Sequence, residues 1–158
     1  MKRISDLLGL KASEAEKLGI KLNELLANYQ VFYQNLRGFH WNITGDKFFE
    51  LHAKFEELYN DAVEKIDEVA ERILTLGSTP LHTFNDYLKT ASIKEAKGLT
   101  GGKETVEATV DNLSTIIRLE REILPLAQDA NDEGTLTLLT DYISQQEKVV
   151  WMLSATLR

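Results

Sequence analysis

Apolar residues recur at three- and four-residue intervals through four long stretches of the chain, and this spacing constrains the fold more than any other feature. Such spacing gathers apolar side chains on one face of an α-helix. The first stretch opens at Ser13, where Glu16 three residues later completes the pattern of a capping box. The alternating pattern typical of β-strands is absent. The predicted helices cover about residues 13–40, 46–76, 103–127 and, after a turn at 131–134, the rest of the chain.

Four long amphipathic helices predict an all-α fold, a four-helix bundle. The connection between the second and third helices is long, and its apolar stretch Phe84–Leu88 predicts a short extra helix there. A connection that can cross the bundle is typical of the ferritin-like fold, although helical spacing alone also allows a plain up-and-down bundle. We expect a single domain over residues 1–158, with a short N-terminal extension at about 1–12.

Composition limits the chemistry. The chain has no cysteine, so any metal ion must be held by imidazole or carboxylate groups. Acidic residues outnumber basic ones 25 to 18, for a net charge of −7, which favours the attraction of cations and disfavours general binding to nucleic acids. No apolar run has the length of a signal peptide or a transmembrane helix, so we expect a cytoplasmic protein with no membrane contact.

The second predicted helix has three faces when its residues are placed about 100° apart around the axis. One face is an apolar stripe for the core: Phe48, Leu51, Phe55, Leu58, Ala62, Ile66, Val69 and Ile73. The opposite face is expected to be solvated: Lys54, Glu57, Asp61, Glu64, Lys65, Glu68 and Arg72. The third mixes apolar residues with groups that bind cations: His52, Glu56, Tyr59, Asn60, Val63, Asp67, Ala70, Glu71 and Leu74. Since a monomeric bundle needs one apolar stripe, the third face predicts a contact between subunits.

Two pairs of candidate ligands lie on this third face. His52 and Glu56 are four residues apart, as are Asp67 and Glu71, so each pair projects from one side of the helix. The pairs themselves are separated by about 22 Å, at about 1.5 Å of rise per residue. They cannot bind one ion within a single chain.

A twofold dimer would bring the two pairs together. If two copies of the helix cross antiparallel, His52 of one copy meets Asp67 of the other, and two identical sites form. His40 ends the preceding helix and can reach the same end as His52. The resulting set of imidazoles and carboxylates suits Fe(II), Mn(II) or Zn(II). Taken singly, however, each of these residues is more often only a hydrogen-bonding group, and Asp67 could pair with a neighbouring base.

The order and spacing of these residues resemble the signature of the Dps family of mini-ferritins. Eleven residues separate His40 from His52, fourteen separate His52 from Asp67, and three separate Asp67 from Glu71. The run Asp67–Ile73 and the closing segment Lys148–Leu153 also resemble this family, and the similarity spans nearly the whole chain.

This resemblance implies a hollow dodecamer with ferroxidase centres at its dimer interfaces. Iron(II) would be oxidised there, preferably by hydrogen peroxide, and ferric mineral would be stored inside. The family's iron ligands match His40 and His52 of one subunit with Asp67 and Glu71 of the next, and Glu56 matches the acidic residue that supports a second iron position.

Two features depart from the family pattern. We expect no lysine-rich tail of the kind that DNA-compacting members carry, because the first eleven residues hold only three basic side chains and the last helix is predicted to run to Arg158. Aspartates usually line the pore through which iron enters, at the start of the last helix. Asp132 and Glu133 could serve here, but Thr137 stands where an acid is common.

Three other functions compete with iron oxidation. A DNA-compacting protein with incidental metal binding would need clustered lysine and arginine, which are sparse. A di-iron enzyme with its site inside one bundle would need a Glu-x-x-His motif, and no glutamate here has a histidine three residues later. A metal-free helical interaction module would not explain why His52, Glu56, Asp67 and Glu71 share one face of the second helix.

The charge pattern predicts no stable complex with duplex DNA at about 0.15 M salt, because an acidic protein without basic tails meets a polyanion under modest screening. An electrophoretic mobility shift assay without divalent metal checks this. A retained shift would contradict the prediction, whereas a shift that needs added metal would not.

Overall fold

The computed structural model describes residues 3–158; Met1 and Lys2, at the start of the predicted extension, lie outside the described residues. The part of the chain described contains helices and no strand, as predicted. None of these helices combines the length and apolar character needed to cross a bilayer. The helices are α1 (Ile4–Leu7), α2 (Ala12–Asn42), α3 (Phe48–Thr75), α4 (Phe84–Thr90), α5 (Gly102–Asp129) and α6 (Glu133–Ala155).

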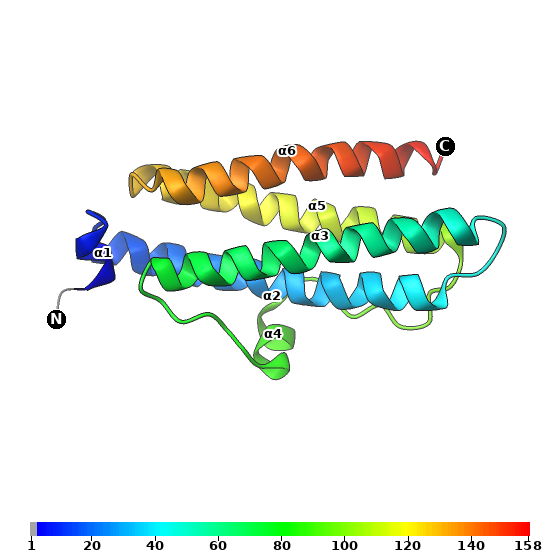
Figure 1. Ribbon diagram of the computed structural model, residues 1–158, viewed down its shortest axis with the longest axis horizontal. Helices are drawn as coiled ribbons and strands as arrows, with labels where there is room; N and C mark the ends of the chain where they lie inside the picture. Colours follow the sequence, from blue (N-terminus) through cyan, green and yellow to red (C-terminus); the bar gives the residue numbers. More distant parts are fainter. Residues whose placement is uncertain (1–2) are drawn as a thin grey trace.

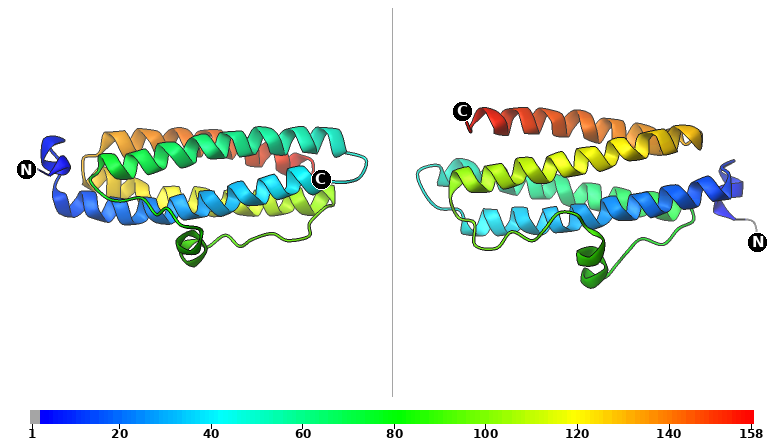
Figure 2. Two further views of the ribbon diagram at one scale, coloured as in Figure 1. Left: turned by 60° about the horizontal axis from the view of Figure 1, so that its bottom comes forward. Right: turned by 180° about the vertical axis from the view of Figure 1, so that it is seen from behind.

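The long helices α2, α3, α5 and α6 form a four-helix bundle with a crossover connection (Figure 1). The tight turn after α2 makes α3 antiparallel to it, and the turn after α5 does the same for α6. Residues 76–101 run back along the outside of the bundle, with α4 midway, so that α3 and α5 point in the same direction (Figure 2). This confirms the ferritin-like connectivity and excludes the up-and-down alternative.

Asparagines of α2 hold the crossover connection against the bundle. Asn28 and Asn35 are buried, and their amide groups satisfy backbone atoms of the connection that would otherwise lack partners. The bonds are Asn23 Nδ2 to Thr79 O (3.1 Å), Leu81 N to Asn23 Oδ1 (2.8 Å), Ser92 N and Ile93 N to Asn28 Oδ1 (3.0 and 2.9 Å), Asn35 Nδ2 to Lys94 O (2.9 Å) and Ala96 N to Asn35 Oδ1 (2.9 Å).

The predicted start of the first long helix is wrong in detail. The helix begins at Ala12, with Lys11 at the N-cap position and no side-chain cap, so Ser13 and Glu16 do not form a capping box. The short helix α1 causes the shift. Leu10 N donates to Ser5 O (2.9 Å), and Gly9 takes a positive φ of 74°, so the chain already turns into α2 ahead of Ser13.

The face of α3 that was expected to be solvated is partly covered by α6. Lys65 is buried, pairs with Asp61, reaches Gln145 Oε1 at 3.2 Å and lies 5.0 Å from the centre of the Tyr142 ring. Arg72 is also largely covered and pairs with Asp132. The prediction fails for these two residues because long basic side chains can bury their stems against a neighbouring helix.

The asparagine contacts predict that Asn28→Ala loosens the crossover connection. The substitution leaves the amides of Ser92 and Ile93 without an acceptor, at a cost of about 2 kcal/mol in the free energy of unfolding. Hydrogen exchange at these two amides should become faster. Asn85→Ala, at an exposed position of α4, is the matched control, and equal exchange in both variants would contradict the anchoring role.

Candidate metal centre

The turn between α2 and α3 brings His40 and His52 into contact. His40 lies in the last turns of α2 and is 9% exposed, and His52 lies near the start of α3. Their rings stack with centroids 3.8 Å apart and planes inclined by 20°. Gly45, with a φ of 107°, permits the sharp turn, and Thr44 N donates to Thr100 O (2.9 Å), which fastens the turn to the end of the crossover.

Each histidine is oriented by the main chain of the other. His40 Nδ1 lies 2.7 Å from His52 O, and His52 Nδ1 lies 2.8 Å from His40 O. Because a carbonyl oxygen only accepts, both Nδ1 atoms must carry the hydrogen. In the neutral ring the lone pair that can bind a metal is then on Nε2. Metal-binding histidines usually have their other ring nitrogen hydrogen-bonded in this way, which fixes the tautomer and the orientation of the ring.

Aromatic residues of α3 enclose the histidine pair. The Phe48 ring stacks on His52 with centroids 5.1 Å apart and planes 19° apart, and Tyr59 meets His40 edge-on at 5.3 Å. The imidazoles therefore have little freedom to rotate, which leaves the two Nε2 atoms preorganised for a ligand.

The three candidate carboxylates are exposed on α3. Glu56 lies one turn beyond His52, whereas Asp67 and Glu71 lie near the far end of the helix. None of the three carboxylates forms a hydrogen bond or an ion pair with any residue in the range 3–158, so the alternative of a salt bridge for Asp67 is not found within the chain. The structure thus joins the two histidines but not Asp67 and Glu71, and residues 3–158 contain no cluster of three metal-binding side chains.

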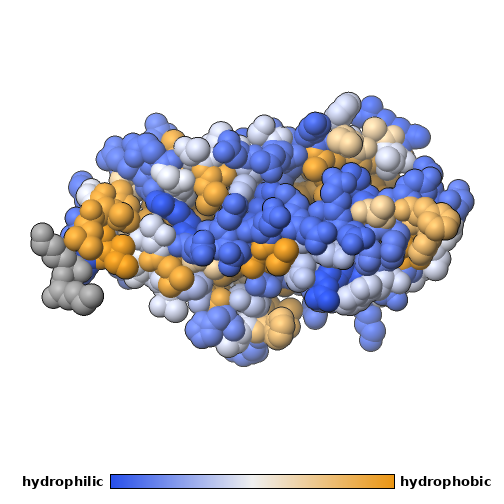
Figure 3. Space-filling view, viewed as in Figure 1, coloured by the Kyte–Doolittle hydropathy of each residue, from blue (hydrophilic) through white to orange (hydrophobic). Residues whose placement is uncertain are grey.

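Apolar side chains occupy the same face of α3 as these carboxylates. Val63 is 42% exposed and Leu74 is 53% exposed, and Tyr59 and Ala70 beside them are half-buried. The face shown in Figure 3 is mostly hydrophilic, with apolar patches towards both ends of the bundle and smaller ones between them. Apolar groups interspersed with unpaired carboxylates are typical of a surface that a partner covers.

The carboxylate end of α3 is fastened to the start of α6. Arg72 pairs with Asp132 and its Nε donates to Thr135 Oγ1 (2.9 Å), while Asp132 caps α6 by accepting from Thr135 N (3.1 Å). Gly134 leaves room for the guanidinium, since a Cβ there would lie 2.9 Å from Arg72 Nη1. Asp132 is consequently buried and cannot line a pore as suggested, and only Glu133 of that acidic pair stays exposed.

The chain is similar to known proteins over almost its whole length. The profile of the ferritin-like domain matches residues 20–158. The DNA protection during starvation protein of Porphyromonas gingivalis is 48% identical over 155 residues, which cover 98% of each chain. A Vibrio cholerae DPS protein, described as a member of a broad superfamily of ferritin-like diiron-carboxylate proteins, superposes with a TM-score of 0.95 at 55% identity, covering 96% of each chain. A Bacillus brevis Dps protein superposes with a TM-score of 0.90 at 40% identity, covering 94% of this chain and 99% of that one.

The reciprocal bonds predict the tautomer of both histidines in metal-free protein. Solid-state NMR of protein labelled with ¹⁵N-histidine at pH 8 should show protonated Nδ1 and unprotonated Nε2 for His40 and His52. The variant His82→Gln removes the third histidine signal and simplifies assignment. The opposite tautomer at either residue would contradict the geometry.

Proposed function

The chain belongs to the Dps family of ferritin-like proteins, and on this basis we propose that it oxidises Fe(II) at sites shared between two subunits and stores the ferric product as mineral. The observation that carries the proposal is the arrangement of α3. The oriented Nε2 atoms of His40, at the end of α2, and of His52 lie near one end of α3, and two carboxylates without partners in residues 3–158 lie about 22 Å away at its other end.

A twofold dimer accounts for both halves of this arrangement. With α3 antiparallel to α3 of a second copy, the histidines of each chain face the carboxylates of the other, and the exposed Val63 and Leu74 become buried. Both burial of apolar surface and closure of the metal site favour the same contact.

The residues have distinct roles in this proposal. His40 and His52 from one chain, with Asp67 and Glu71 from the other, would hold one Fe(II), and Glu56 would help to hold a second. The mixed nitrogen and oxygen set suits this ion, and the ligands leave coordination positions open for an oxidant. Two Fe(II) ions supply the two electrons that reduce one molecule of hydrogen peroxide to water, so little hydroxyl radical should escape.

The family membership also motivates the larger assembly. We propose that dimers assemble into a shell of twelve chains of 17.9 kDa, about 215 kDa in all, which would keep the mineral in its interior and protect the cytoplasm from iron-driven oxidation. The DNA protection named in relatives would follow from removal of iron and peroxide rather than from stable DNA binding.

A complementation experiment tests the shared site. His52→Ala and Asp67→Ala, each expressed alone, should lose peroxide-dependent iron oxidation. Co-expression places wild-type His52 from one chain opposite wild-type Asp67 from the other in one site of each mixed dimer. With about half of the dimers mixed and one of their two sites intact, activity should return to about one quarter of the wild-type rate.

Two controls accompany this experiment. His82→Ala, at an exposed histidine away from the pair, should keep full activity, and native mass spectrometry should show that each variant assembles like the wild type. If verified mixed dimers recover nothing, the site does not draw on both chains.

A further inference from the structure

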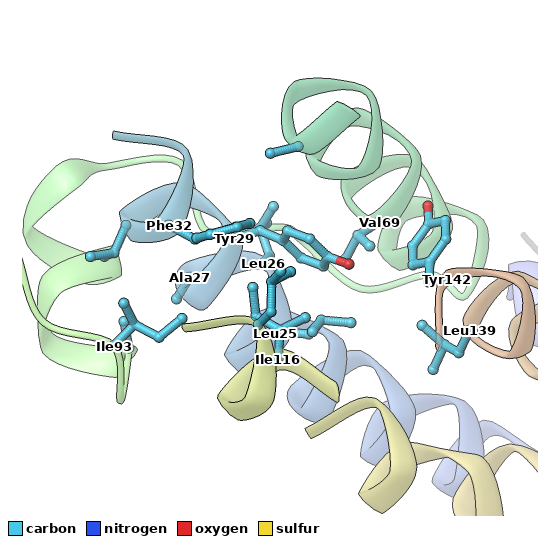
Figure 4. Close-up of a cluster of buried hydrophobic side chains, with 14 of the residues drawn as sticks. Leu25, Leu26, Ala27, Tyr29, Phe32, Val69, Ile93, Ile116, Leu139 and Tyr142 are labelled. Atoms are coloured by element: carbon cyan, nitrogen blue, oxygen red, sulfur yellow. The ribbon is translucent and has the colours of Figure 1, made fainter. Parts of the chain in front are cut away.

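A group of polar side chains lies in the centre of the bundle, remote from α3's exposed face. Tyr29 of α2 donates to Glu120 Oε1 of α5 (2.7 Å), and Gln146 of α6 donates from Nε2 to Glu120 Oε1 (3.0 Å) and to the Tyr29 hydroxyl. Glu120 is 0% exposed and Gln146 is 3% exposed. Tyr29 points across the core towards Tyr142, among leucine, isoleucine and valine side chains (Figure 4).

Two oxygens of this group have no partner among the described residues: Glu120 Oε2 and Gln146 Oε1. An ionised carboxylate and an amide oxygen can only accept, so neither atom can satisfy the other. Buried polar atoms without a partner are rare and costly, and here two acceptors occur on side chains that are already bonded to each other.

Two basic side chains lie near Glu120, but each is paired with another acid and neither forms a hydrogen bond with Glu120. The cation on α3, Lys65, is bonded to Asp61 and Gln145. Arg121, next to Glu120 on α5, is half-exposed and pairs with Glu147 of α6.

The other titratable neighbours of this group supply no positive charge to Glu120. Asp61 and Glu68 on α3 are acids, and Glu68 already accepts from the Tyr142 hydroxyl of α6. The pKa of Tyr29 on α2 is raised well above its usual value by burial and then by Glu120. Burial is thus the effect that favours an uncharged side chain at this position.

We propose that Glu120 is a proton-binding site, a neutral carboxylic acid whose Oε2–H donates to Gln146 Oε1 and closes a cyclic acid–amide pair in the core. A single hydrogen then supplies the missing partner of both oxygens. The bond from Gln146 Nε2 to Glu120 Oε1 is the other half of that cycle. Burial, the largest effect, raises the pKa of Glu120 to about 7, while hydrogen bonds from Tyr29 and Gln146 and the charges of Lys65 and Arg121 lower it in part.

Proton binding at Glu120 makes the stability of the bundle depend on pH. The pKa of the folded state, about 7, lies above the usual 4.5, so the unfolded chain gives up this proton at lower pH than the folded chain does. The contribution of Glu120 to stability is therefore complete below pH 4.5 and is lost as the pH rises through 7. This dependence is separate from iron oxidation.

The variant Glu120→Gln tests the proposal, because glutamine has the shape and neutrality of the protonated acid. In metal-free assembled protein at fixed ionic strength and protein concentration, the wild-type equilibrium constant for folding should fall on the order of a hundredfold more between pH 5 and pH 8 than that of Glu120→Gln. Glu122→Gln, at an exposed position of the same helix, should behave like the wild type.

Infrared spectroscopy gives a second measurement that needs no variant to be stable. The wild type at pH 6 should show the carbonyl stretch of a buried protonated carboxyl group, which disappears with a midpoint near pH 7. Identical pH dependence in wild type and Glu120→Gln, or no such band at pH 6, would overturn the proposal. Stabilisation by added Na⁺ or Mg²⁺ that Glu120→Gln abolishes would also overturn it, since a metal ion would then occupy the position.

Discussion

The fixed rise of the α-helix is the constraint on which the candidate site depends. Over the length of α3 it keeps His52 and Asp67 about 22 Å apart, whatever the side chains do. Both ends of the helix are also fastened to the rest of the bundle, by the Thr44–Thr100 bond near the histidines and by the Arg72–Asp132 pair near the carboxylates. A rigid helix with candidate ligands at each end can bring them together only with a second copy of itself, so in the proposed dimer oligomer formation and metal binding would be coupled.

Polar groups inside the bundle hold the crossover connection in place and join three of the long helices. Asn28 and Asn35 on α2 are buried because they replace the backbone partners that the crossover connection lacks. Glu120 and Gln146 join α5 to α6 and, through Tyr29, to α2. Apolar packing alone would tolerate several helix arrangements, whereas these bonds are satisfied in one.

The sequence predicted the helices, the crossover and the approach of His40 to His52, because each depends on local spacing or on a short turn. It did not predict contacts between distant residues. The burial of Lys65 depends on its contacts with α6. Asp132, which caps α6, also accepts a hydrogen bond from Arg72, sixty residues earlier in the chain. Glu120 is in the core because it continues the inward row of Leu113 and Ile116 at helical spacing. This spacing is visible in the sequence, but a glutamate is not ordinarily expected at a buried position. The meeting of the histidines with Asp67 and Glu71 stays a prediction.

The reciprocal bonds of His40 and His52 have a consequence for how this site tolerates mutation. In many metal sites a carboxylate side chain orients the ligating imidazole, so a substitution in that outer layer changes the metal affinity. Here the acceptors are the carbonyl groups of the two histidines themselves, which every amino acid possesses. The direction of the two Nε2 atoms is thus set by the backbone of one turn, so side chains at neighbouring surface positions can be substituted without changing that direction.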